Sequence, residues 1–158
     1  MTTFVIETSE FIAMRAFYVL LFLMLSLSCD SDPVNRNPFL QEVSFRFELN
    51  LNLPLYNNLN NIANPVYVDN ASVGIRGAFV IRSGPDTFLA FEASCPNQVP
   101  SSCSTMTLEG VNVVCPCDDF EYNLLTGQLL NRPDDGERYY DLLFYQAVLV
   151  GNSVIISN

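Results

Sequence analysis

The sequence predicts an all-β domain of short antiparallel strands, an antiparallel β-sandwich or small barrel. Apolar and polar residues alternate with a period of two from Val43 to Leu53, which is typical of a half-buried strand. Gly151-Asn152 separates two strand-like runs near the end of the chain and is a two-residue hairpin signal. Turn residues interrupt the chain at short, regular intervals, which argues against a parallel sheet.

The remaining elements follow from the positions of these turn residues. Residues 54–65 are rich in Asn and have Pro at both ends, so we expect a long loop with one helical turn over residues 59–63. Residues 83–86, Ser-Gly-Pro-Asp, mark a turn between two strands. The expected strands cover residues 43–53, 66–68, 74–82, 87–92, 139–150 and 153–157.

Charge and composition exclude several classes of function. The chain carries seven basic residues, all of them arginine, against 17 acidic residues, and its net charge is −10. Because contacts with nucleic-acid phosphates depend on Lys and Arg, a nucleic-acid partner is not expected. The chain contains no histidine, which excludes a Ser-His-Asp or Cys-His catalytic centre and any histidine metal site. Most familiar hydrolases and metal enzymes are thereby excluded, and we do not expect an enzyme.

The first 28 residues are typical of a targeting segment. Residues 16–28 form an apolar run that follows Arg15. This run suits the core of a signal peptide and is shorter than the roughly 20 residues of a membrane span. Two acidic residues lie upstream of this core, and translation from Met14 would leave them out.

The apolar run ends in a sequence that resembles a bacterial lipobox. Residues 25–29 read Leu-Ser-Leu-Ser-Cys, so we expect cleavage before Cys29 and a diacylglycerol on its thiol. Alternatively, Cys29 follows an ordinary signal peptide or an uncleaved anchor. The odd number of cysteines supports lipidation, since five cysteines less Cys29 leave four for the domain. The expected parts are a signal peptide (1–28), a lipidated cysteine with a polar tether (29–42) and a β domain (43–158), held in the bacterial cell envelope.

Four cysteines lie in two short motifs in the middle of the domain. The first motif is Cys95-Pro96-Asn97, followed by Cys103, and the second is Cys115-Pro116-Cys117-Asp118. This arrangement resembles the two loops of a Rieske iron–sulfur domain, which carry Cys-x-His and Cys-x-x-His and hold a 2Fe–2S cluster. The resemblance covers roughly residues 43–158 and implies a Rieske-like β-sandwich with an inserted subdomain that carries the two cysteine loops.

The resemblance also assigns a role to each position. It implies that Cys95 and Cys115 occupy cluster-binding positions, with Asn97 and Asp118 in place of the two histidines. Cys103 and Cys117 fall at positions where many members of the family have a disulfide between the two loops. The sequence departs from the Rieske pattern at two further places. Asp119-Phe120 stands where the family has Gly-Ser, and Arg132 stands where it has a loop glycine.

These departures lead to the hypothesis that the domain has lost its cluster and holds two disulfides, Cys95–Cys115 and Cys103–Cys117. The expected function is then a structural or interaction role in a lipid-anchored envelope protein, with an envelope protein as partner and no cofactor. The alternative is electron transfer through a 2Fe–2S cluster with atypical ligands, in which Asp118 joins Cys95 and Cys115.

Three further alternatives use the same region. The four cysteines could hold zinc as a tetrathiolate if they were reduced. Cys95 and Cys115 could exchange disulfides, although no Cys-x-x-Cys motif and no activating cation accompany them. The acidic residues at 118–121 and 134–137 could bind calcium through hard oxygen ligands, but their spacing matches no known calcium loop.

Overall fold

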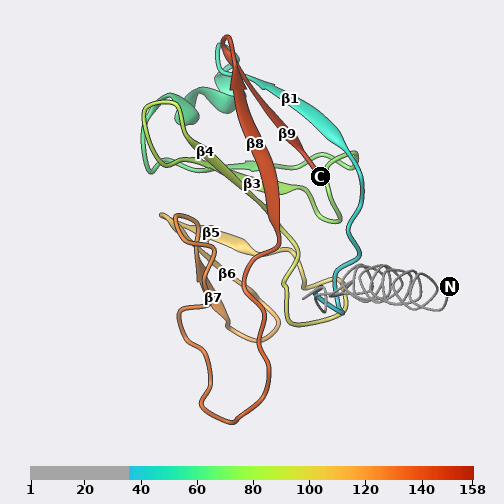
Figure 1. Cartoon of the computed structure of the whole chain (residues 1–158). Helices are drawn as coiled ribbons and strands as arrows, with labels where there is room; N and C mark the ends of the chain where they lie inside the picture. The colour runs from blue at the N-terminus through green and yellow to red at the C-terminus, as the bar shows by residue number, and fades with distance from the viewer. Residues whose placement is uncertain (1–35) are drawn as a thin grey trace, which may run out of the picture. The chain divides into compact units, whose positions relative to one another are not determined.

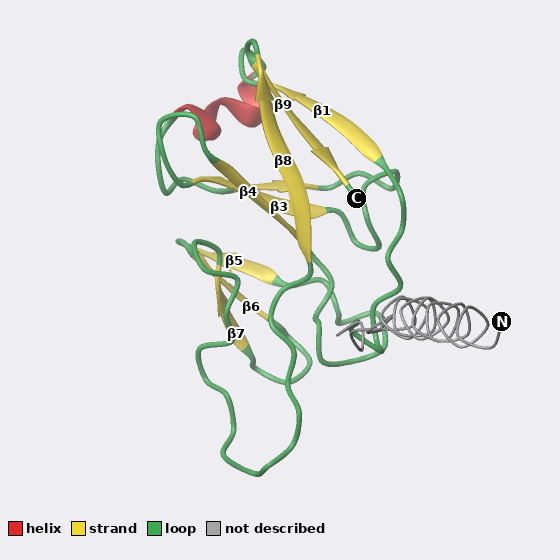
Figure 2. Cartoon of the chain, in the orientation of Figure 1, coloured by secondary structure: helices red, strands yellow, loops and turns green. Residues whose placement is uncertain are grey.

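The computed structural model describes residues 36–158, of which Asn37–Asn158 form one compact unit. The regular secondary structure of this part of the chain is β except for a single 3-10 helix, η1 (Pro54–Asn60) (Figure 2). Within these residues, no helix has the length and hydrophobicity of a transmembrane span. The predicted signal peptide and Cys29 lie outside the described residues. The strands in chain order are β1 (Arg46–Asn50), β2 (Val66–Val68), β3 (Ala78–Arg82), β4 (Phe88–Glu92), β5 (Thr107–Glu109), β6 (Asn112–Val114), β7 (Glu121–Asn123), β8 (Phe144–Val150) and β9 (Ser153–Ser157).

Six strands form one antiparallel sheet in the order β1-β9-β8-β4-β3-β2 (Figure 1). The expected hairpin at Gly151-Asn152 is confirmed, since Val150 pairs with Ser153 across it. β4 and β8 share only two residue pairs, Ala90 with Tyr145 and Phe91 with Phe144. The sheet is therefore two three-stranded halves with a short junction, and the antiparallel all-β fold expected from the sequence is confirmed.

A first hydrophobic core lies between the two halves of this sheet. It combines residues of β1 and β9 with residues of β2, β3 and β4, so the sheet curls over itself in the manner of a partial barrel. The side chain of Tyr145 on β8 is fully buried in it. The core comprises Leu49, Leu51, Tyr56, Leu59, Val66, Val68, Val73, Ala78, Val80, Phe88, Ala90, Tyr145, Val154 and Ile156.

A second, smaller sheet is inserted between β4 and β8 in the chain, as the Rieske resemblance implies. Its order is β5-β6-β7, and all its strands are antiparallel. A second core packs it against the opposite face of β3 and β4. Ala78 and Val80 of β3 belong to the first core, whereas Phe79 and Ile81 belong to the second. β3 is thus buried on both faces, which explains why its sequence is apolar without alternation.

The start of β3 differs from the sequence expectation. The strand was expected from residue 74, but it begins at Ala78. Gly74 and Gly77 have φ values of +56° and +84°, in the left-handed region that interrupts a strand. The N–H groups of Ile75 and Arg76 instead donate to the carboxylate of Glu92 at 2.7 and 2.9 Å. A buried acid, rather than a neighbouring strand, satisfies this part of the backbone.

Other element boundaries also differ. β1 covers Arg46–Asn50, the middle of the expected strand over residues 43–53. The helical turn lies over Pro54–Asn60 instead of residues 59–63, with Pro54 at the first helical position, where its fixed φ is favourable. β8 begins at Phe144 instead of residue 139.

The compact unit begins earlier than the expected domain start at residue 43. Asn37 Nδ2 donates to the carbonyl of Pro96 at 2.6 Å, and Leu40 is buried. The last residues of the expected tether therefore pack on the domain.

Candidate functional site

The two cysteine motifs lie in two loops that meet beside the small sheet. The first loop, residues 93–106, connects β4 to β5 and is held at its base by Cys95 N–H donating to the carbonyl of Ser104 at 2.7 Å. The second loop connects β6 to β7, and Cys115 N–H donates to the carbonyl of Phe120 at 2.9 Å. Asp119 within it has a φ of +57°, a conformation that favours glycine, which is the residue that the Rieske resemblance implies there.

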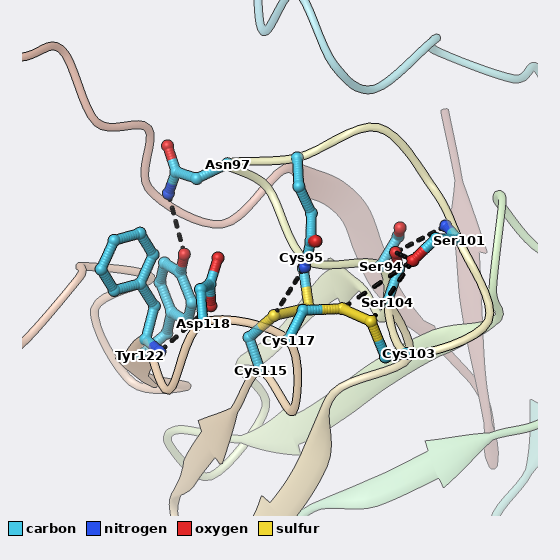
Figure 3. The surroundings of a disulfide bond; sticks show 12 residues. Ser94, Cys95, Asn97, Ser101, Cys103, Ser104, Cys115, Cys117, Asp118 and Tyr122 are labelled. Atoms are coloured by element: carbon cyan, nitrogen blue, oxygen red, sulfur yellow. Dashed lines mark hydrogen bonds between the residues drawn. A yellow bond between two sulfur atoms is a disulfide. The ribbon is translucent and has the colours of Figure 1, made fainter.

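Two disulfides join these loops in the pairing proposed from the sequence. Cys95 bonds to Cys115 and Cys103 bonds to Cys117, with Cα–Cα distances of 5.7 and 5.5 Å. The first disulfide is fully buried, since both cysteines are 0 % exposed. The second lies at the surface, with Cys103 exposed and Cys117 half-buried. Figure 3 shows the two disulfides next to each other.

The sulfur atoms of the two disulfides also converge. The Sγ atoms of Cys95, Cys115 and Cys117 all lie within 4.8 Å of one another. Among residues 36–158 this is the one group of three or more potential metal-binding side chains. The acidic residues considered for calcium do not gather in this way.

Asn97 occupies a histidine position of the resemblance and has a structural role there. Its side chain pairs with the backbone of Tyr140 at both ends, because Oδ1 accepts from the N–H at 2.7 Å and Nδ2 donates to the carbonyl at 2.9 Å. Nδ2 also donates to the Tyr122 hydroxyl at 2.8 Å. The amide thus ties the first loop to the segment before β8 and to β7. Figure 3 shows its bond to Tyr122.

Asp118 occupies the other histidine position and lies beside Tyr122 (Figure 3). One carboxylate oxygen accepts from Phe120 N–H at 3.2 Å. Burial raises the pKa of Asp118, and the neighbouring charge of Asp119 adds to the rise. Burial also raises the pKa of Tyr122 far above its ordinary value, and the charge of Asp118 raises it further. The environment of Asp118 is therefore one that disfavours extra negative charge.

The residues at this site do not fit a Rieske 2Fe–2S cluster. Such a cluster needs two thiolates and two imidazoles. The sulfurs of Cys95 and Cys115 are bonded to each other, and both polar atoms of the Asn97 side chain are engaged with Tyr140 and Tyr122. Asp118 offers only oxygen, and the chain has no histidine to supply.

Sequence reasoning missed the polar side chains that contact the disulfides. Gln98 Nε2 lies 2.9 Å from Cys115 Sγ, and Ser101 Oγ lies 3.4 Å from Cys103 Sγ and 3.8 Å from Cys117 Sγ. Both residues lie within the first loop, between its two cysteines. Their position in the sequence could have predicted these contacts, because a short loop closed by disulfides places its polar side chains near the sulfurs.

Comparisons with known proteins find likenesses in structure. No family model and no curated protein matches the chain. The crystal structure of the cyanobacterial plasma membrane Rieske protein PetC3 from Synechocystis PCC 6803 matches with 20 % identity and a TM-score of 0.40, covering 50 % of this chain and 74 % of that one. A chain of the complex of reduced oxygenase and oxidized ferredoxin in carbazole 1,9a-dioxygenase matches with 22 % identity and a TM-score of 0.42, covering 61 % of this chain and 82 % of that one. Both matches cover only part of this chain, and its resemblance to Rieske domains rests on the cysteine motifs.

Proposed function

We propose that this protein is a lipid-anchored protein of the bacterial cell envelope whose Rieske-like domain holds two disulfides in place of a 2Fe–2S cluster. The domain is not an enzyme and has a structural or interaction role. The observation that carries the proposal is the buried bond between Cys95 and Cys115, the two cysteines at the positions where the resemblance implies iron.

The loss of the cluster is supported by what the other cluster positions do instead. Asn97 makes three hydrogen bonds that join separate parts of the domain, so its side chain stabilises the fold. The two disulfides close loops that in the chain-entropy model stabilise a domain by about 3 kcal/mol each. In this proposal, disulfides and hydrogen bonds join the two loops that a cluster would otherwise hold together.

The envelope location is supported by the cysteine chemistry and by the leader sequence. Disulfides persist in oxidising compartments outside the cytosol, and this domain carries two. The lipobox-like residues 25–29 end at Cys29, and acyl chains on a cysteine hold a protein at a membrane by about 0.8 kcal/mol per buried methylene.

An interaction role is supported by the outward face of β8. Phe144, Val148 and Val150 share this face with the polar, exposed Gln146 and are 51, 55 and 57 % exposed. Exposed apolar side chains that share one face of a strand are a surface on which a protein partner can bind. We propose a partner protein in the envelope with a complementary apolar surface.

A second candidate function, electron transfer through an iron–sulfur cluster, is favoured by one observation. Reduction of the buried disulfide would free Cys95 and Cys115, whose sulfur atoms lie within 4.8 Å of Cys117 Sγ. In that case Cys95, Cys115 and Asp118 would be the ligands, and the domain would carry iron when its disulfides are reduced.

Iron content and the visible spectrum distinguish these two functions. The full chain is purified without reductant from cells grown with ample iron, beside a Cys95→Ser/Cys115→Ser variant as the control that cannot hold iron at these positions. The proposed function predicts two colourless, iron-free proteins with the same spectrum. A brown wild-type protein with about two irons per chain, the content of one such cluster, and a colourless variant would contradict it.

The anchor is tested separately by labelling bacteria with a radioactive fatty acid. The wild-type chain should take up the label and partition into the membrane fraction, and Cys29→Ser should do neither. Equal labelling of the two chains, or none of either, would contradict lipidation at Cys29.

A further inference from the structure

The two disulfides are close enough to react with each other. Cys117 belongs to the outer disulfide, yet its Sγ lies within 4.8 Å of both sulfurs of the inner disulfide, Cys95 and Cys115. Disulfides exchange when a thiolate attacks a disulfide sulfur and displaces its partner. A thiolate on Cys117 therefore has a disulfide within a short movement of its loop.

The two bonds differ in access to solvent. Cys103 is exposed, whereas Cys95 and Cys115 are both 0 % exposed. A dissolved thiol thus reaches the outer disulfide first, at Cys103. Attack there leaves the electron pair of the broken bond on Cys117, the sulfur that lies next to the inner disulfide.

Hydrogen-bond donors lie beside the sulfurs that would carry charge. The Ser101 hydroxyl contacts both sulfurs of the outer disulfide, at 3.4 Å from Cys103 and 3.8 Å from Cys117. Gln98 Nε2 donates to Cys115 Sγ at 2.9 Å. A donor to a sulfur stabilises its thiolate and makes it a better leaving group. Ser101 and Gln98 are positioning residues in this arrangement.

We propose that the two disulfides form an exchange relay in which Cys117 is the shared sulfur. The thiolate of an external thiol bonds to Cys103 Sγ, the Cys103–Cys117 bond breaks, and Cys117 leaves as a thiolate. Cys117 then bonds to Cys95 Sγ, the Cys95–Cys115 bond breaks, and Cys115 leaves as the thiolate that Gln98 stabilises. The external thiolate is consumed and the Cys115 thiolate is formed, so the two exchange steps need no other oxidant or reductant.

This relay would transmit the thiol state of the envelope to a bond that solvent does not reach. It rests on the proposed function, because Cys95 and Cys115 must be bonded to each other and not to iron.

Two single variants test the relay as a matched pair. Cys103→Ser and Cys117→Ser remove the same disulfide, but the first leaves its free thiol beside the inner disulfide and the second leaves it on exposed Cys103. Each full-length variant is purified without reductant. Acid denaturant then stops thiol–disulfide exchange, and N-ethylmaleimide alkylates the free thiols. Cleavage after Glu109 separates Cys95 from Cys115 and Cys117, and peptide fragmentation then assigns the label.

The relay predicts that Cys103→Ser carries part of the label on Cys115 or Cys95 as well as on Cys117. We expect at least about a tenth of the label on Cys115 or Cys95. This is the fraction expected if the equilibrium constant favours the native disulfide over the exchanged one by no more than about tenfold. The Cys117→Ser variant should carry its label on Cys103 alone. Label confined to Cys117 in the first variant would overturn the relay, and so would scattered label in both variants, since proximity would then not be the cause.

Wild-type protein provides a test that needs no variant to fold. Brief treatment with glutathione should yield glutathione on Cys103 together with a Cys95–Cys117 bond. Glutathione on Cys103 with Cys117 as the sole free thiol would overturn the relay. Iron is assayed in the same samples, because iron would contradict the proposed function itself, whereas an iron-free protein without exchange contradicts only the relay.

Discussion

The Tyr145 hydroxyl donates a hydrogen bond to Glu92 Oε2 at 2.6 Å in the interior of the domain, where both side chains are 0 % exposed. The same carboxylate accepts from the N–H groups of Ile75, Arg76 and Ser94 at 2.7, 2.9 and 2.8 Å. Four donors therefore satisfy one buried carboxylate. The contact joins β8 to β4 at the short junction of the curled sheet, directly before the first cysteine loop.

Removing the Tyr145 hydroxyl should destabilise the domain. Tyr145→Phe keeps the ring in the core but takes one donor from a buried charged group, which costs about 1.5–3 kcal/mol in free energy of unfolding. Tyr139→Phe is the matched control, because its hydroxyl donates to the exposed Asp135, and it should change stability little. Denaturant unfolding measures both, and an equal effect of the two substitutions would contradict the role assigned to Glu92.

Gly74 should not tolerate a side chain because it lies against Glu92 and Tyr145. A Cβ there would collide with Glu92 Oε2 and lie 2.6 Å from the Tyr145 hydroxyl oxygen. Gly110 also has a positive φ, but a Cβ on it would meet nothing within 4 Å. Gly110→Ala should cost about 1–2 kcal/mol for the left-handed backbone, and Gly74→Ala about 1–3 kcal/mol more for the overpacking. Equal unfolding free energies of the two variants would show that the contact is not tight.

Asn97 should contribute to stability through its three hydrogen bonds. Asn97→Ala leaves the backbone of Tyr140 and the Tyr122 hydroxyl without these partners, and an unsatisfied buried group costs about 1–3 kcal/mol. Asn131 makes a similar pair of bonds, to Glu121 N–H and the Asp119 carbonyl, but is exposed. Water can replace its amide, so Asn131→Ala should cost less than about 1 kcal/mol. A smaller loss of unfolding free energy in Asn97→Ala than in Asn131→Ala, measured by denaturation, would contradict this role of Asn97.

Stability should fall as the pH rises above about 10, the ordinary pKa of tyrosine. Burial raises the pKa of Tyr145, and the charge of Glu92 raises it further; burial raises the pKa of Tyr122 as well. Below pH 10 both hydroxyls stay protonated in the folded and the unfolded chain, so they add no pH dependence. Above it the unfolded chain loses these protons while the folded chain keeps them, and unfolding is favoured.

The measurement is the denaturant midpoint over the range from neutral to strongly alkaline pH, recorded with short exposure so that the disulfides persist. Tyr145→Phe should show a shallower alkaline fall than the wild type, since it has lost one of the two tyrosines. Identical alkaline profiles would mean that Tyr145 ionises equally in both states.

The longer strands and the cysteine pairing could be predicted from the sequence. β1 alternates over enough residues to show its period, and Gly151-Asn152 marks the β8–β9 hairpin. The disulfide pairing followed from the resemblance of the cysteine motifs, which brings Cys95 to Cys115 and Cys103 to Cys117.

The small sheet and the polar contacts could not be predicted. β5, β6 and β7 are three residues each, too short for a period to appear. Their pairing depends on packing against β3 and β4, which lie far away in the chain. Glu92 ends an apolar strand, and only the tertiary fold brings the N–H groups of Ile75 and Arg76 to its carboxylate.

The oxidation state of the four domain cysteines, in protein purified without reductant, decides whether a disulfide has replaced the cluster. No arginine open to trypsin lies between Arg82 and Arg138, because Pro133 follows Arg132, so one tryptic fragment holds all four cysteines and excludes Cys29. We predict a fragment four hydrogens lighter than its all-thiol form, with no alkylation before reduction and four additions after it. A fragment only two hydrogens lighter, with Cys95 and Cys115 alkylated before reduction, would contradict the claim that a disulfide replaces the cluster.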